Sequence, residues 1–529
     1  MRKILVIFCG VLICMQFSLS ISVSHAADNN NTIGANNLSH SNNINIADRK
    51  KRQIPIDQHV ITQHKTTILD KKVAYSATTG TQPVWDNEGN PTATLFYTYY
   101  QRTDIKDNSS RPLVISFNGG PGSASVWMHV AYTGPRVLNV DNEGYPLQPY
   151  GVKSNDYSIL DVADIVFVNP VNTGYSRVLP DADGKMPSKD EQQKMFFGVN
   201  ADVSYLAEWI TTFVSRNERW RSPKFLIGES YGTTRVSGLA LELQKNQWMY
   251  PNGVILVSPT DIGIERNGPV KAANRLPYFA ATAWYHKALA EDLQQQDLTP
   301  LLAEVENFTI NQYLPALAKG SFIDDEEKQR IAKQVARYSG LSVKEVLQSN
   351  LDIDTDYFWK TLLRERQQTV GRLDSRYLGI DKKTVGARPD YNAELTSWLH
   401  SFTPAINDYL RTELNYKTDI KYNMFGPVHP WDRSNDNSGE NLRLAMAQNP
   451  YLNVMIQSGY YDGATNYFDA KYTMWQLDRS GQMKNRLSFK GYRSGHMMYL
   501  RYEDLKQSNQ DLREFILSSL PKPNQAAKY

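Results

Sequence analysis

The chain has 529 residues, of which 41% are hydrophobic and 21% charged, and its formal net charge is +3. These values are ordinary for globular proteins, and they exclude collagen-like, coiled-coil and wholly disordered chains. The small net charge provides no basic surface for nucleic acid, so we expect no nucleic-acid partner. The function must therefore be sought in local sites.

The first 26 residues have the pattern of a secretory signal peptide. Two basic residues precede an apolar run that reaches Val23, and small residues follow it, so cleavage is predicted after Ala26. An uncleaved membrane anchor is the alternative, because the run is long. With cleavage we expect export to the periplasm or the extracellular space and no stable membrane insertion. The two cysteines, Cys9 and Cys14, lie inside this segment, so the exported protein has no disulfide.

Residues 27–54 form a leader that is rich in Asn and poor in large apolar residues. Such a segment buries too little surface to offset its ordering entropy, so we predict that it is disordered. The folded part is expected from about residue 55.

Alternating strand and helix patterns predict an α/β protein. Buried-type strands end in Gly or Pro loops, as expected of a mostly parallel central sheet that carries a site at its carboxyl edge. The predicted strands cover 72–77, 92–100, 112–117, 165–168, 224–227, 254–258, 452–457 and 487–490, and the predicted helices cover 188–213, 233–247, 466–476 and 503–520.

Between residues 262 and 421 the apolar spacing is helical. We therefore predict one catalytic domain, made of 55–261 and 422–529, that is interrupted by a helical cap insertion at 262–421.

The motif with the clearest chemistry is the GxSxG around Ser230, which follows an apolar strand and precedes a helix. This context predicts a nucleophile elbow, a strained turn that lifts the serine hydroxyl above the sheet. A serine hydroxyl needs a base and a carboxylate that orients the base. Asp462 and His496 each follow a later predicted strand, in the chain order Ser, Asp, His. His429 is the chief competing histidine, and His129 is a weaker candidate.

An oxyanion hole needs two converging backbone N–H groups. Tyr231 follows the nucleophile, and Gly120 lies in a Gly-rich loop after the 112–117 strand. These two residues are the predicted donors.

Four separated motifs then resemble the serine carboxypeptidases. They are Asn118-Gly119-Gly120-Pro121-Gly122, Asn169-Pro170-Val171-Asn172-Thr173-Gly174-Tyr175-Ser176, Gly228-Glu229-Ser230-Tyr231 and Gly495-His496-Met497. The resemblance implies an α/β-hydrolase fold with a cap. It also implies a Ser230, Asp462 and His496 triad, and a binding site for the substrate's terminal carboxylate at Asn118 and Glu229.

The chemistry of Glu229 agrees with that role, because a protonated carboxyl can donate a hydrogen bond to a substrate carboxylate whereas an ionised one would repel it. This predicts peptidase activity favoured by acid. The sequence also departs from the family. Tyr132 stands where many members have a second acidic residue that shares a proton with the glutamate. The disulfide framework of the eukaryotic members is absent, as in bacterial relatives, which favours a bacterial exported member.

No metal or cofactor motif is present, so none is predicted. Three functions remain. The first is an exported serine carboxypeptidase that acts on peptides with a free C-terminus through an acyl-enzyme intermediate. The second is an esterase or acyltransferase that uses the same triad. The third is a non-catalytic binding protein on the same fold. Oligomeric state and side-chain preference stay open.

Overall fold

The computed structural model describes residues 52–522 and 525–528. The predicted signal peptide over 1–26 and nearly all of the predicted leader over 27–54 lie outside the described residues. Everything below concerns the described part.

The strands are β1 (His59–Ile68), β2 (Lys71–Trp85), β3 (Pro91–Arg102), β4 (Leu113–Phe117), β5 (Arg136–Leu138), β6 (Val152–Ser154), β7 (Asp164–Val168), β8 (Arg177–Val178), β9 (Lys224–Glu229), β10 (Gly253–Val257), β11 (Thr369–Val370), β12 (Leu378–Gly379), β13 (Asn453–Gly459) and β14 (Leu487–Tyr492). The central sheet has the order β1-β2-β3-β7-β4-β9-β10-β13-β14. Neighbours pair antiparallel from β1 to β7 and parallel from β7 to β14. The mostly parallel sheet predicted from the strand pattern is therefore confirmed.

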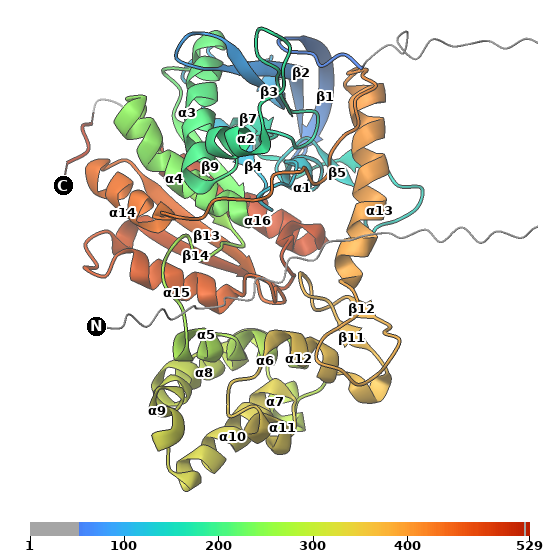
Figure 1. Ribbon diagram of the computed structural model, residues 1–529, viewed down its shortest axis with the longest axis vertical. Helices are drawn as coiled ribbons and strands as arrows, with labels where there is room; N and C mark the ends of the chain where they lie inside the picture. The colour runs from blue at the N-terminus through green and yellow to red at the C-terminus, as the bar shows by residue number, and fades with distance from the viewer. Residues whose placement is uncertain (1–51, 523–524, 529) are drawn as a thin grey trace, which may run out of the picture. The chain divides into compact units, whose positions relative to one another are not determined.

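The helices are α1 (Val126–Ala131), α2 (Lys189–Phe196), α3 (Val199–Arg216), α4 (Tyr231–Asn246), α5 (Pro269–Asn274), α6 (Leu276–Tyr285), α7 (Glu291–Gln294), α8 (Leu298–Phe308), α9 (Leu314–Lys319), α10 (Asp325–Ser339), α11 (Val343–Gln348), α12 (Thr355–Thr361), α13 (Ala393–Asp408), α14 (Ser438–Gln448), α15 (Tyr467–Leu477) and α16 (Tyr502–Ser518). Figure 1 shows α3, α4 and α14 beside the sheet and α5 to α12 gathered in a separate group.

Both faces of the sheet are buried. Successive side chains of a strand point in opposite directions, so one strand contributes side chains to the apolar clusters on both faces. In β9, Phe225 and Ile227 belong to one apolar cluster, whereas Leu226 belongs to another. The first cluster is completed by α1 and α16 and the second by α3, α4 and α14. A strand that is covered on both faces has a continuous run of apolar residues, and such runs allowed these strands to be predicted from the sequence.

The structure differs from the expectation at several elements, including the short strands β5, β6, β8, β11 and β12 and the helices α1 and α14, which were not predicted. The single helix predicted over 188–213 is two helices, α2 and α3, because Gly198 is extended and the backbone on either side of it pairs with Asp432: Asp432 N–H donates to Phe197 O and Val199 N–H to Asp432 O, each at 2.9 Å. A capping box formed by Ser188 and Glu191 opens α2. The edge strand β1 was missed because its alternating side chains are largely polar and part-exposed.

Residues 262–421 contain α5 to α13 and the short β11–β12 pair. Helices α5 to α12 pack around a third apolar cluster, which also includes Tyr461, Tyr467 and Phe468. Helix α13 differs, because Trp398, Phe402 and Ile406 belong to the same cluster as α1 and α16. Figure 1 shows α13 leaving the group of α5 to α12 and extending toward the sheet.

Within residues 52–522 and 525–528, we find no helix with the length and apolar character that crossing a membrane requires.

Candidate active site

Ser230 stands between β9 and α4, in the strand, turn and helix context predicted for it. Its backbone has φ 58° and ψ −126°, a strained conformation for a residue with a side chain. The flanking glycines are needed for packing: a Cβ on Gly228 would lie 2.1 Å from Gly232 O, and one on Gly232 would lie 2.9 Å from Phe117 O. The turn thus has the geometry expected of a nucleophile elbow.

His496 and Asp462 form a buried hydrogen-bonded pair on the loops after β14 and β13. His496 Nδ1 and Asp462 Oδ2 are 2.7 Å apart, and the carboxylate also accepts the N–H groups of Ala464 and Thr465 and the hydroxyl of Thr465. Burial by itself would lower the pKa of His496, but the charge of Asp462 and its hydrogen bond outweigh burial and raise the pKa above the usual value. The acceptor on Nδ1 places the proton there and leaves Nε2 as the basic nitrogen.

Ser230 and His496 line one cleft of about 320 Å³. Every predicted site residue except Asp462 lines this cleft, and Asp462 is fully buried and hydrogen-bonded to His496. The structure therefore brings together, from the carboxyl ends of four strands, the residues that the sequence had nominated separately.

The Gly-rich loop lies directly against the elbow. A Cβ on Gly119 would lie 2.4 Å from the backbone nitrogen of Tyr231, and Gly120 has φ +104°, so both positions require glycine. Within the described residues, the N–H groups of Gly120 and Tyr231 donate to no backbone or side-chain acceptor. Two free donors at the cleft are the arrangement that an oxyanion hole needs.

Glu229 lies beside Ser230 with only 3% of its surface exposed. Its Oε2 accepts hydrogen bonds from Asn118 Nδ2 and from the hydroxyl of Tyr499, each at 2.6 Å, and its Oε1 is 4.0 Å from His496 Nε2. Burial raises the pKa of Glu229 to about 7, against the lowering effect of His496 and of the two hydrogen bonds. The carboxyl group is thus neutral in acid.

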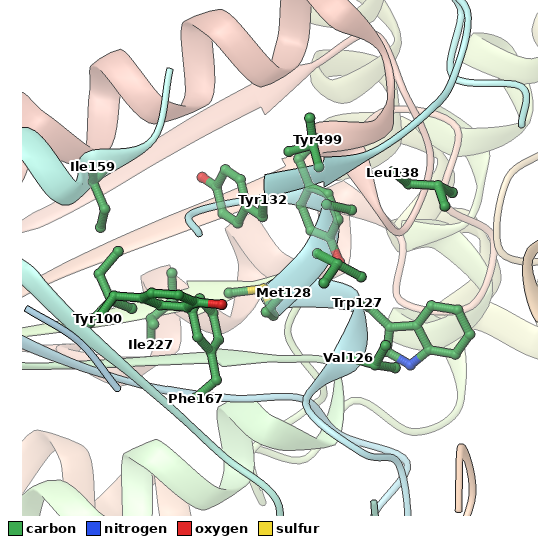
Figure 2. Packing of buried hydrophobic residues seen from close by; sticks show 14 of the residues in the cluster. Tyr100, Val126, Trp127, Met128, Tyr132, Leu138, Ile159, Phe167, Ile227 and Tyr499 are labelled. Carbon is green, nitrogen blue, oxygen red and sulfur yellow. The ribbon is translucent and has the colours of Figure 1, made fainter. Parts of the chain in front are cut away.

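Tyr132 forms no hydrogen bond with Glu229 within the described residues. Its hydroxyl donates to Gln457 Oε1 at 2.7 Å, and its ring stacks on that of Tyr499 with centroids 4.6 Å apart. Figure 2 shows the two rings side by side in the apolar cluster. The sequence reasoning missed Tyr499, although its position three residues after His496, on a loop already assigned to the site, was a usable signal.

The competing histidines lie elsewhere. His129 is buried against Phe167 and hydrogen-bonds Tyr100 at 2.6 Å, and burial lowers its pKa to about 3. His429 is exposed and does not line the cleft.

A segment of the insertion, residues 371–376, holds both loops of the pair. Leu373 O accepts the N–H of His496 at 2.7 Å, and Arg372 O accepts the N–H of Gly463 at 3.0 Å. The segment is held in turn by Glu394, whose Oε1 accepts the N–H of Leu373 at 2.9 Å. Sequence reasoning assigned no site role to this segment, because the contacts join parts of the chain about 90 and about 120 residues apart that share no local pattern.

The geometry can now be compared with known proteins. The family model described as serine carboxypeptidase matches residues 71–504. Serine carboxypeptidase-like 36 of Arabidopsis thaliana is 29% identical over 175 residues, which is 32% of this chain and 33% of the relative. Pheromone-processing carboxypeptidase KEX1 of Saccharomyces cerevisiae (strain JAY291) is 29% identical over 147 residues, or 28% of this chain and 18% of the relative. The chain thus spans about a third or less of the length of these two relatives.

Among solved structures, the crystal structure of the prohormone-processing carboxypeptidase KEX1(delta)p from Saccharomyces cerevisiae has a TM-score of 0.48 and 15% identity, and the match covers 84% of this chain and 92% of that one. These relatives come from a plant and a yeast, so they give no support to the bacterial origin expected from the missing disulfides. The mostly parallel sheet with its elbow and helical insertion is an α/β-hydrolase fold. Because the family model covers most of the chain, this protein belongs to the serine carboxypeptidase family.

Proposed function

We propose that the protein is a serine carboxypeptidase that releases C-terminal residues from peptides through an acyl-enzyme intermediate. The observation that supports this function best is the group formed by Asn118, Glu229 and Tyr499 next to Ser230. A carboxyl that is neutral below pH about 7 can donate a hydrogen bond to a peptide's terminal carboxylate. An esterase has no need for such a group.

In the proposed reaction, the Ser230 hydroxyl attacks the carbonyl carbon of the last peptide bond, and His496 Nε2 takes its proton. Asp462, bonded to Nδ1, keeps the imidazole in the required tautomer and stabilises the imidazolium. The negative charge on the carbonyl oxygen is bound by the N–H groups of Gly120 and Tyr231.

The C–N bond then breaks, and His496 gives its proton to the leaving amine. The C-terminal residue departs as a free amino acid, and the rest of the peptide remains esterified to Ser230. Water attacks this ester with His496 again as base, which releases the shortened peptide and restores the serine.

The experiment compares an N-blocked dipeptide with its C-terminal amide and its ester, from acid to mildly alkaline pH, with Ser230→Ala as control. A carboxypeptidase cleaves the free acid best in acid, loses that activity as Glu229 ionises, and loses all activity in the variant. Efficient ester cleavage with poor cleavage of the free acid would instead indicate an esterase or acyltransferase.

We further propose that the protein is exported after removal of residues 1–26. The support is the basic, apolar and small-residue pattern of that segment. N-terminal sequencing of the exported protein should begin at Ala27. Recovery of the intact N-terminus with the membrane fraction would contradict the proposal.

A further inference from the structure

The cleft that contains Ser230 also contains two arginines. Arg372 comes from the insertion and Arg433 from the segment that precedes α14, and both side chains are exposed. Arg372 is anchored through its carbonyl on Gly463, beside Asp462. The guanidinium of Arg433 lies 5.9 Å from the centre of the Tyr231 ring.

Within the described residues, no carboxylate is bonded to either guanidinium, although the charge of Arg372 acts on the carboxyls of Asp356 and Glu394. In the part of the chain that the structure describes, Arg372 and Arg433 form no ion pair, whereas the buried Arg235 and Arg376 are each paired with an aspartate at 2.6 Å. The difference matters because an arginine without a carboxylate partner offers five N–H donors in a geometry that fits a carboxylate.

The charge of the cleft is therefore unbalanced. Among the lining residues the one carboxyl is Glu229, which faces Asn118 and Tyr499 and is neutral in acid. The rest of the wall is largely apolar and includes the aromatic side chains of Trp127, Trp398 and Phe425. Such a wall can hold the methylene groups of a side chain whose end carries a charge.

We propose that Arg372 and Arg433 form a subsite for an acidic side chain, so that the preferred peptides carry Asp or Glu at one of the two residues that flank the cleaved bond. This inference rests on the proposed function, since it names the substrate class of that same site. The two arginines act as specificity residues and take no part in bond cleavage.

The size of the preference follows from the exposure of the arginines. Exposed ion pairs contribute up to about 1 kcal/mol each, or roughly a fivefold gain in kcat/KM per arginine. Exposed pairs are also screened, because the Debye length falls from about 10 Å at 0.1 M salt to about 3 Å at 1 M. The preference should therefore shrink in high salt.

The test measures kcat/KM for N-blocked dipeptides with Glu or Gln as the last residue, and for a second pair with Glu or Gln as the penultimate residue. At mildly acidic pH and low salt, the Glu peptide of at least one pair should be cleaved about fivefold better than its Gln partner. Arg372→Gln and Arg433→Gln should each reduce that ratio, and the peptide pair that shows the preference assigns the subsite to one side of the bond. The matched control Arg221→Gln removes an exposed arginine outside the cleft and should leave the ratio unchanged.

Equal cleavage of Glu and Gln peptides in both pairs, or a preference that survives both cleft substitutions, would overturn the proposal. Peptide binding to Ser230→Ala is measured by the fluorescence of the tryptophans in the cleft. This measurement distinguishes failure of the acidic subsite from failure of the proposed function. If no peptide is hydrolysed by the wild-type protein but the variant binds Glu peptides more tightly than Gln peptides, the carboxypeptidase function is wrong and the acidic subsite stands. If Gln peptides are hydrolysed and Glu peptides are neither preferred nor bound more tightly, the subsite is wrong and the function stands.

Discussion

Replacing Glu229 by Gln should separate the recognition of the substrate carboxylate from the chemistry of the triad. In the structure Oε2 accepts hydrogen bonds from Asn118 and Tyr499, while Oε1 faces His496 at 4.0 Å. A glutamine oxygen can replace Oε2, and its amide group then stands where the protonated Oε1 would be. The variant therefore imitates the neutral form of Glu229 at every pH.

The magnitude follows from the pKa of about 7 and from Coulomb's law. Two carboxylates about 4 Å apart repel each other by about 4 kcal/mol at an effective dielectric constant of 20, or roughly a thousandfold in affinity. The ionised enzyme should therefore be almost inactive on free acids. Two pH units above the pKa, only about one hundredth of the protein keeps its proton, so kcat/KM of the wild type should fall by about that factor.

The assay is the pH profile of kcat/KM for an N-blocked dipeptide and for its ester, with wild type and Glu229→Gln measured side by side. On the free acid, the wild type should lose activity above pH about 7 and the variant should not. On the ester, which has no carboxylate, neither protein should show the alkaline loss. An unchanged alkaline loss in Glu229→Gln would refute the assignment of Glu229 to the substrate carboxylate.

Three further substitutions test the surroundings of the site. Tyr499→Phe removes a hydrogen bond that lowers the pKa of Glu229, so the alkaline loss of peptidase activity should move to higher pH. The control Tyr132→Phe removes a hydroxyl that bonds Gln457 instead, so it should not move the alkaline loss. Equal pH profiles for the two variants would contradict the assignment of Tyr499 to Glu229. Asp462→Asn should reduce kcat on peptides and esters alike by roughly ten-thousandfold, because the required imidazole tautomer is lost. The circular dichroism spectrum should stay unchanged. A reduction of kcat below about tenfold would show that Asp462 does not act in the triad. Glu394 is fully buried, and burial raises its pKa from 4.5 to about 7. Its protonated form therefore stabilises the folded state fully below pH about 4.5, and this stabilisation is lost as the pH rises through about 7. Denaturant titrations should accordingly show the wild type losing about 3 kcal/mol relative to Glu394→Gln between mildly acidic and mildly alkaline pH, and parallel pH dependences of the two proteins would count against the buried carboxyl.

Local patterns were sufficient for much of the fold. The buried strands β4, β7, β9, β10 and β13 stood out because their two covered faces produce continuous apolar runs. The capping boxes that open α2 and α11 are local patterns too, because a serine and a glutamate three residues later satisfy each other's backbone donors. By contrast, the break between α2 and α3 depends on the pairing of Asp432 with Phe197 and Val199, far apart in the sequence.

The candidate site divides in the same way. The sequence by itself determined the elbow at Ser230, the Gly-rich loop, and the Asp and His that follow later strands, because each depends on a short motif at the carboxyl end of a strand. Only the tertiary structure decided that Tyr499 rather than Tyr132 bonds Glu229. It also decided that residues 371–376 hold the loops of Asp462 and His496. Finally, it placed Arg372 and Arg433 in the same cleft. Those contacts join segments whose separation along the chain carries no periodic signal, and their geometry is set by packing of the whole core.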